Sequence, residues 1–114
     1  MASSTDISLW EASLEEKYRQ RETQRQQVLA GAINTLKRYF RQKRVRKVYL
    51  TGSILREGKY YPFSDLDIAV EGLDEDYFET LVQLEDLLDR NVDLIDLESC
   101  RFKREIQERG LKIL

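Results

Sequence analysis

The sequence predicts an α/β (α+β) domain that begins with a long N-terminal helix. A proline-free segment over about 8–43 is rich in Glu, Gln, Arg, Leu and Ala, which favour helix. Three short runs rich in β-formers follow at about 45–51, 65–71 and 91–98, and helical apolar spacing fills the segments after the second and third. The predicted order is helix, strand, strand, helix, strand, helix. A chain of 114 residues is large enough for one such domain with a core.

The N-terminal helix has two apolar stripes separated by a polar stretch. The stretch 19–27, "RQRETQRQQ", has no apolar face, so the part of the helix before it is expected to project or bend. We therefore divide the chain into an N-terminal helical extension, 1–27, and a domain, 28–114. The stripe expected to pack on the domain consists of Leu29, Ala32, Ile33, Leu36 and Phe40. The separate stripe expected to serve a partner or self-association consists of Leu9, Trp10, Leu14 and Tyr18.

Turn and capping residues punctuate the rest of the chain. Asp74 is predicted to cap a helix that runs to about Arg90, with acidic residues in its first turn. Ser99 is expected to cap a last helix and Gly110 to end it, which leaves "LKIL" as a tail or short strand. The apolar face of the first of these two helices is predicted to consist of Tyr77, Phe78, Leu81, Leu84 and Leu88.

Charge and composition exclude several classes of function. Nineteen Lys and Arg against 21 Asp and Glu give a formal net charge of −2, so no global basic field favours nucleic acid as a partner. Seven cations lie in 37–47; they form either a solvated helix end or a local patch for an anion or acidic partner. No apolar run approaches the roughly 20 residues that span a bilayer, so no membrane association is expected.

Cysteine and histidine usage constrain the compartment and the chemistry. The single cysteine, Cys100, cannot form an internal disulfide, and no apolar N-terminal segment is typical of a signal peptide. We therefore expect a cytoplasmic protein. The chain has no histidine, which removes a common zinc ligand and general base, so oxygen atoms would have to bind any metal.

The second strand carries two carboxylates where a buried strand would carry apolar residues. Asp65 and Asp67 lie two residues apart in a predicted strand, so both side chains project from one face. Two such like charges are costly unless a cation lies between them, and Mg²⁺ favours carboxylate oxygens together with substrate phosphates. Gly52 and Ser53 end the preceding strand, where glycine lets a phosphate approach the backbone and serine offers hydrogen-bond donors. A third acid, Asp93, lies in the third predicted strand.

Each of these features has a plainer interpretation when it is taken alone. The second Asp-x-Asp in the chain, at 74–76, is better explained as a helix start. Gly52-Ser53 could be an ordinary turn, and Arg56 and Lys59 could be plain loop cations. Asp93 could face water on an edge strand, and Asp96 or Asp89 could take its place. The joint pattern is much harder to explain in this way than its parts.

Taken together, "GSILREGKYYPFSDLDIAV" and "NVDLIDL" resemble the minimal nucleotidyltransferases of the polymerase-beta-like superfamily. Their signature is Gly-Ser, an Arg four residues after the Gly, Ser-Asp-x-Asp among apolar residues, and a later Asp in a strand. The chain follows the family's element order from about residue 28 to 114. It departs in a longer first helix and in a loop from Ser53 to Asp65 that is one residue longer than the commonest form. The matching positions are Gly52, Ser53, Arg56, Ser64, Asp65, Asp67 and Asp93.

The resemblance implies a polymerase-beta-like nucleotidyltransferase fold, a small mixed β-sheet flanked by helices. It also implies transfer of a nucleotide from ATP with two Mg²⁺ ions. Asp65, Asp67 and Asp93 would hold the metal ions, and Asp93 could accept the proton of the attacking hydroxyl. The triphosphate would be bound by Gly52 and Ser53, with Ser64 as part of the same motif and Arg56 as a weaker candidate.

The resemblance further implies a protein acceptor. Minimal members are commonly paired with a helical HEPN-type toxin, and the expected function is that of an antitoxin that transfers AMP to a tyrosine hydroxyl of that toxin. The alternative is a non-catalytic antitoxin or regulatory module that masks its partner through the N-terminal helix. A transferase for a small molecule such as an aminoglycoside is a third possibility, disfavoured because no second domain closes over a substrate.

Overall fold

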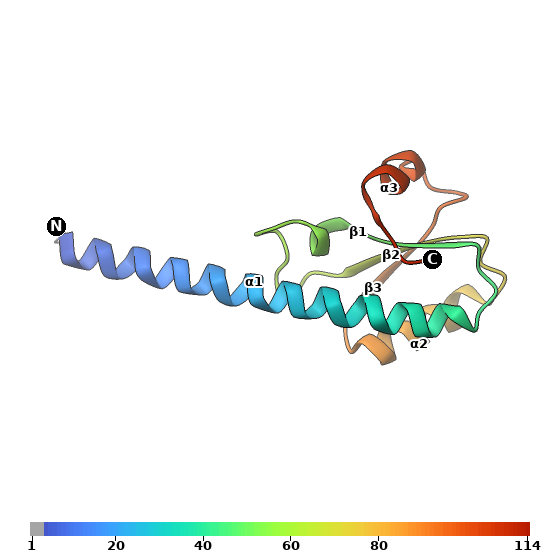
Figure 1. The fold of residues 1–114 in the computed structure, drawn as a ribbon, viewed down its shortest axis with the longest axis horizontal. Helices are drawn as coiled ribbons and strands as arrows, with labels where there is room; N and C mark the ends of the chain where they lie inside the picture. The colour runs from blue at the N-terminus through green and yellow to red at the C-terminus, as the bar shows by residue number, and fades with distance from the viewer. Residues whose placement is uncertain (1–3) are drawn as a thin grey trace.

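A computed structural model of the protein describes residues 4–114, and it has four strands in one mixed sheet. The sheet order is β3-β2-β1-β4, in which β1 is antiparallel to β2 and β4 while β2 and β3 are parallel (Figure 1). This arrangement confirms the predicted α/β class and the predicted order of elements. The elements are α1 (Ser4–Arg41), β1 (Lys47–Thr51), the 3-10 helix η1 (Gly52–Leu55), β2 (Leu66–Glu71), α2 (Tyr77–Leu88), β3 (Val92–Asp96), α3 (Lys103–Arg109) and β4 (Leu111–Lys112).

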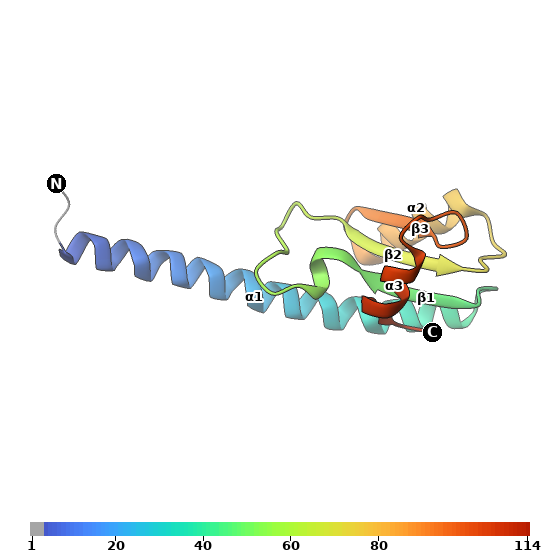
Figure 2. The same cartoon turned by 90° about the horizontal axis from the view of Figure 1, so that it is seen from above.

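The helices cover both faces of the sheet. Figures 1 and 2 show α1 and α2 against one face and α3 against the other. Strand alternation explains this layering, because Leu66, Ile68 and Val70 of β2 join the core under α1 and α2. Ala69, from the opposite face of the same strand, packs with Ile106 of α3 in a smaller cluster. Asp67 and Ala69 flank Ile68 in β2, so their side chains project from the same face of the sheet, the face covered by α3.

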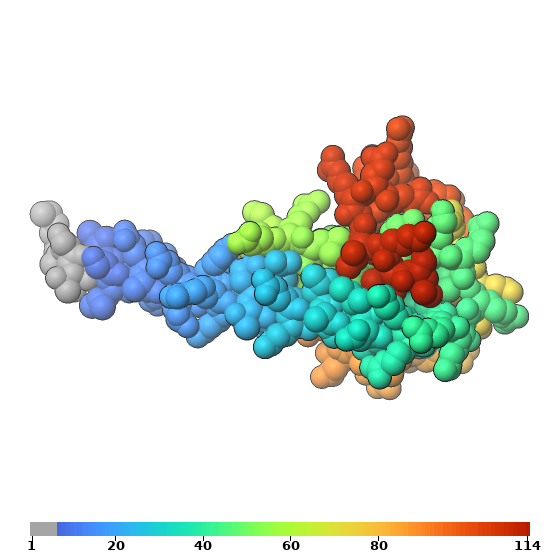
Figure 3. Space-filling model, viewed as in Figure 1, coloured from blue at the N-terminus to red at the C-terminus, as the bar shows by residue number. Residues whose placement is uncertain are grey.

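Helix α1 is continuous, and only its C-terminal part packs on the sheet. Leu36 and Phe40 are 0% and 1% exposed, as their helical spacing predicts. Leu9 and Trp10 are 66% and 64% exposed, and the space-filling view shows the N-terminal part of the helix standing clear of the domain (Figure 3). The helix therefore projects without bending. The division into 1–27 and 28–114 stays a prediction.

Three local predictions are wrong. The N-cap of α2 is Asp76, whose Oδ1 accepts from the Glu79 N–H at 2.8 Å, whereas Asp74 is an exposed residue whose carboxylate lies 3.5 Å from Arg44. Phe78, expected on the buried face, is 73% exposed, because the buried residues of α2 are Thr80 and Leu84 and a residue two positions before Thr80 lies on the opposite side of the helix. Helix α3 begins at Lys103 with no side-chain cap, because Ser99 belongs to the turn that follows β3.

The C-terminal predictions hold. Gly110 ends α3, and its N–H donates to the Ile106 carbonyl at 2.7 Å. The tail after Gly110 forms β4, the alternative of a short strand, and pairs with β1.

At least two cationic side chains of 37–47 form ion pairs within the domain. The side chain of Arg44 pairs with Glu75 at 3.4 Å, and that of Arg46 pairs with Glu98 at 3.1 Å. These ion pairs join the segment between α1 and β1 to the acidic half of the chain. They favour the plainer interpretation of the basic run over that of an anion-binding patch. Among the residues that the structure describes, no helix is both long enough and apolar enough to cross a membrane.

Candidate active site

The strand register brings two of the predicted carboxylates side by side. Asp67 on β2 is aligned with Asp93 on the parallel strand β3, and with Thr51 on the antiparallel strand β1. Because aligned residues of neighbouring strands project from the same face, both side chains lie on the α3 side of the sheet. Asp65 immediately precedes β2 and is exposed. The three acids therefore lie at the edge of the sheet where β2 and β3 begin and β1 ends.

The surroundings of Asp67 disfavour its charged form. Burial first, then the charges of Asp93 and Asp65, raise the pKa of Asp67 from 3.8 to about 6. An ionised Asp67 therefore lies in an unfavourable field as long as nothing positive balances the three acids.

Residue 52 has to be glycine, because the Asp67 side chain occupies the space that a side chain at residue 52 would need. The φ of Gly52 is +81°, and a Cβ built there would lie 2.0 Å from Asp67 Oδ2. Gly52 begins η1, so its neighbour Ser53 lies within the same short turn, and the Ser53 carbonyl accepts the Arg56 N–H at 3.0 Å. The structure thus places the Gly-Ser pair directly against the Asp-x-Asp motif.

The other two motif residues lie around this turn. Arg56 is exposed just after η1. Ser64 Oγ accepts the Tyr61 N–H at 3.0 Å, and the Ser64 N–H donates to the Tyr61 carbonyl at 2.9 Å. These bonds shape the turn that leads into Asp65, which is a local structural role. Binding of nucleotide by Arg56 and Ser64 stays a prediction.

The two alternatives to Asp93 lie elsewhere. Asp96 is aligned with Val70 at the far end of β3, and its Oδ1 accepts the Glu98 N–H at 3.0 Å. Asp89 ends α2 with a φ of 51°. Of these three acids, Asp93 is the one that the fold places beside Asp67.

The residues fit a divalent cation by their chemistry, although the side chains are not gathered around one point. Among residues 7–114, whose side chains the structure describes, no three carboxylate, cysteine or histidine side chains are grouped so that they could hold a metal ion. Burial first, and then the charges of Asp93 and Asp65, raise the pKa of Asp67, and a bound cation would oppose this shift. Magnesium ligation by Asp65, Asp67 and Asp93 therefore stays a prediction.

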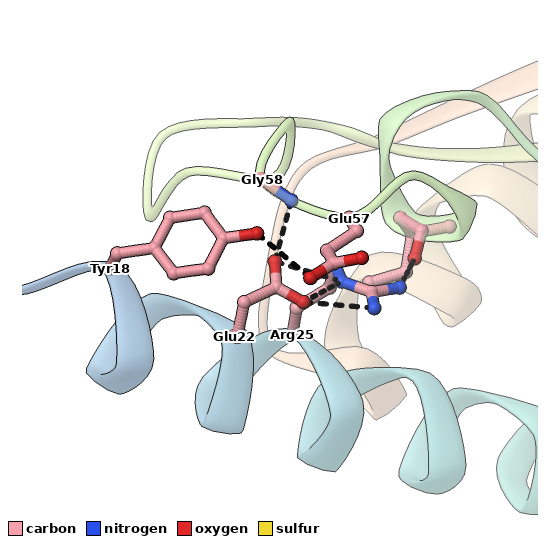
Figure 4. A network of polar contacts seen from close by, with 6 residues as sticks. Tyr18, Glu22, Arg25, Glu57 and Gly58 are labelled. Atoms are coloured by element: carbon pink, nitrogen blue, oxygen red, sulfur yellow. Dashed lines mark hydrogen bonds and ion pairs between the residues drawn. The ribbon is translucent and has the colours of Figure 1, made fainter. Parts of the chain in front are cut away.

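Two residues that the sequence analysis did not single out contact the loop that carries the Gly-Ser pair. Glu22 and Arg25 of α1 hydrogen-bond to the loop backbone at Gly58 and Ile54 (Figure 4). They lie in the stretch 19–27, which has no apolar face in the sequence. No local sequence signal could have identified them, because their partners are about 30 residues away in the chain.

The chain matches one family model and several solved structures. The model described as "Polymerase beta, Nucleotidyltransferase" matches residues 34–114. A crystal structure of a toxin-antitoxin with AMP-PNP is 29% identical, with a TM-score of 0.59 and 72% of each chain covered. The toxin-antitoxin MntA-HepT is 26% identical, with a TM-score of 0.53, and the match covers 73% of this chain and 69% of the other.

A third structure is that of a tri-AMPylated Shewanella oneidensis HEPN toxin in complex with its MNT antitoxin. It is 27% identical, with a TM-score of 0.51, and the match covers 73% of this chain and 69% of the other. No curated protein matches the chain. The family model covers more than half of the chain, and the carboxylates and the Gly-Ser turn lie within the matched residues. The chain therefore belongs to the polymerase beta nucleotidyltransferase family.

Proposed function

We propose that this protein transfers AMP from ATP to a hydroxyl group, a tyrosine of a helical HEPN-type toxin, and thereby acts as the antitoxin of the pair. The observation that carries the proposal is the alignment of Asp67 with Asp93 across β2 and β3, with Gly52 pressed against Asp67. A carboxylate pair in this position, next to a turn that cannot tolerate a side chain, suits the binding of cations and phosphates.

Different residues would bind the metal ions and the phosphates. Asp65, Asp67 and Asp93 would hold two Mg²⁺ ions, which when bound supply activation of the attacking hydroxyl and neutralisation of the triphosphate. Gly52 and Ser53 would bind the β- and γ-phosphates through backbone N–H groups and the serine hydroxyl, with Arg56 adding positive charge from the edge of the loop. These contacts orient the α-phosphorus and leave the base largely unrecognised.

The transfer itself exchanges one phosphorus–oxygen bond for another. The acceptor oxygen forms a bond to the α-phosphorus while the bond from that phosphorus to the α,β-bridging oxygen breaks, and pyrophosphate leaves. Asp93 accepts the proton of the attacking hydroxyl. The exposed Asp93 is accessible to an acceptor hydroxyl that approaches from solvent, whereas Asp67 is partly buried.

Support for a protein acceptor comes from the solved structures to which the chain is similar. They are toxin-antitoxin complexes, one with AMP-PNP and one with an AMPylated HEPN toxin. Their similarity makes ATP the proposed nucleotide and a HEPN-type protein the proposed acceptor.

One observation favours a second candidate, in which the protein masks its partner without chemistry. Leu9, Trp10 and Leu14 on the projecting part of α1 are 66%, 64% and 46% exposed. Such an apolar stripe is typical of a binding surface for another protein or for a second copy of the chain. Masking would need this stripe and would not need Asp67 or Asp93.

The test measures transfer of label and protection from the toxin together. The protein is incubated with ATP labelled at the α-phosphate, Mg²⁺ and the HEPN-type product of the neighbouring gene, alongside Asp67→Asn, Asp93→Asn and the control Asp86→Asn. Asp86 is an exposed acid of α2 outside the site, so its variant should transfer label as the unchanged protein does.

The outcomes separate the two candidates. Transfer to the toxin that both site variants lose, together with loss of protection in cells, is the expected result. Label that never reaches the toxin, or that moves equally well with the site variants, refutes the proposal. Protection that survives in both variants and disappears in Trp10→Ala favours masking.

A further inference from the structure

A buried ion pair lies in the polar stretch 19–27 of α1, which has no apolar face. Glu22 and Arg25 are one helical turn apart, their side chains are 13% and 11% exposed, and Arg25 Nη2 lies 3.0 Å from Glu22 Oε2. Arg25 Nε lies 3.1 Å from the same oxygen. Charges are buried to this extent only when hydrogen-bond partners satisfy them.

The pair binds both ends of one loop segment. Arg25 Nη1 donates to the Ile54 carbonyl at 3.0 Å, and the Gly58 N–H donates to Glu22 Oε1 at 2.6 Å (Figure 4). Ile54 lies in η1 and is fully buried. Carbonyl groups near the end of a short helix lack a partner in the following turn, and here a guanidinium group supplies one.

Two more residues on the same side of α1 contact the loop. Tyr18 Oη donates to Glu57 Oε1 at 2.9 Å, and the Arg21 guanidinium lies 4.6 Å from the centre of the Tyr61 ring. Tyr18 also faces Gly58, whose φ is +75° and whose added Cβ would lie 3.2 Å from the Tyr18 ring. Residues 18, 21, 22 and 25 thus form one continuous strip of α1 that contacts the loop.

This strip is connected to the site through η1. Ile54, which Arg25 contacts, directly follows Ser53 in a turn of only four residues that begins at Gly52. Gly52 in turn lies against the Asp67 carboxylate. The position of the Gly-Ser pair relative to Asp67 therefore depends on where α1 holds Ile54.

We propose that the Glu22–Arg25 pair is a positioning device that holds the Gly52-Ser53 turn in the shape that receives the phosphates of the nucleoside triphosphate. The inference rests on the proposed function, because it takes this turn as the phosphate-binding element. It gives the polar stretch of α1 a role in the site that the apolar pattern of the helix does not reveal.

The experiment compares Arg25→Ala and Glu22→Gln with Arg19→Ala in the full chain. Arg19 is a matched control, because it pairs with Glu16 at the same three-residue spacing on α1, yet the side chains of that pair are 70% and 56% exposed. AMP transfer to the HEPN-type partner gives KM for ATP and kcat, and calorimetry gives the Kd of AMP-PNP. Trypsin reports on the loop through its cleavage after Arg56 and Lys59, which are both exposed.

Arg25→Ala should raise both KM for ATP and the Kd of AMP-PNP on the order of tenfold, with a smaller change in kcat. Trypsin should cleave the loop faster in this variant. Glu22→Gln keeps an oxygen that can accept the Gly58 N–H, so its effect should be smaller, and Arg19→Ala should behave as the unchanged protein. Arg25→Lys, which keeps the charge and one donor, replaces Arg25→Ala if thermal unfolding shows that the alanine variant does not fold.

Failure of the inference can be told from failure of the proposed function. If the unchanged protein transfers AMP but Arg25→Ala leaves both KM and loop cleavage unchanged, the positioning role is refuted and the function stands. If no AMP is transferred, the Kd of AMP-PNP decides, and equal values for Arg25→Ala and Arg19→Ala refute the inference. An unchanged protein that neither transfers AMP nor binds AMP-PNP overturns both.

Discussion

Replacing Asp67 with asparagine should stabilise the metal-free protein above about pH 6 while it abolishes nucleotide transfer. Burial, together with the charges of Asp93 and Asp65, raises the pKa of Asp67 from 3.8 to about 6. The folded protein therefore binds this proton more tightly than the unfolded chain does. The stability that Asp67 contributes is fully present below pH 3.8 and is lost as the pH rises through about 6. Asparagine has nearly the shape of the protonated acid and carries no charge at any pH.

The size of the effect follows from the two pKa values. A separation of about 2 pH units corresponds to about 3 kcal/mol at most. Since Asp67 keeps partial contact with solvent, we expect Asp67→Asn to gain about 1 to 2 kcal/mol at pH 8. The gain should shrink to nearly nothing at pH 4, where the wild-type carboxyl is largely protonated in the folded protein.

Urea unfolding between pH 4 and pH 8, in the presence of a chelator, measures this difference. Asp86→Asn removes the same charge from the exposed face of α2, so its unfolding free energy should stay within about 0.5 kcal/mol of wild type throughout. A gain for Asp67→Asn that is independent of pH, or a loss of stability at pH 8, would refute the proposed electrostatic strain at this site. Mg²⁺ should stabilise the wild type and have little effect on Asp67→Asn, since the cation balances the same charges.

Three further predictions concern single positions. Gly52→Ala should lower the free energy of unfolding by about 1 to 3 kcal/mol and abolish transfer, because the new Cβ would lie 2.0 Å from Asp67 Oδ2 at a positive φ. Urea unfolding and the labelled-ATP assay check this, and a fully active variant would contradict it. Gly31→Ala should stabilise the interior of α1 by about 1 kcal/mol, because an added Cβ would have no atom within 4 Å; a lower melting temperature would contradict this. Lys103 Nζ lies 2.6 Å from Glu71 Oε1, and its hydrogen bond is the largest cause of the lowered pKa of that carboxyl. Lys103→Met removes this partner. It should lower the melting temperature at pH 7, by an amount that decreases as the pH falls through the folded-state pKa of Glu71, and an equal loss at every pH would contradict this.

Short-range patterns were sufficient to predict most of the elements. The spacing of Ala32, Leu36 and Phe40 identified the buried face of α1, because burial on one side of a helix leaves a 3.6-residue repeat. The first residues of the helices were harder to predict from the sequence. Asp74 and Asp76 are both plausible caps, but the Asp74 N–H donates to the Arg44 carbonyl at 2.7 Å, a contact between distant segments, and the helix begins after Asp76.

The motif at 52–67 and the acid at Asp93 were determined by the sequence, together with the fold class and the expectation of nucleotidyl transfer. Their juxtaposition was decided by the sheet, since only the parallel register of β2 and β3 places Asp67 beside Asp93 and leaves Asp96 at the far end. Tertiary structure also decided the role of Glu22 and Arg25. A polar pair contributes nothing to an apolar repeat, so its contact with Ile54 and Gly58 exists only once the loop folds back onto α1.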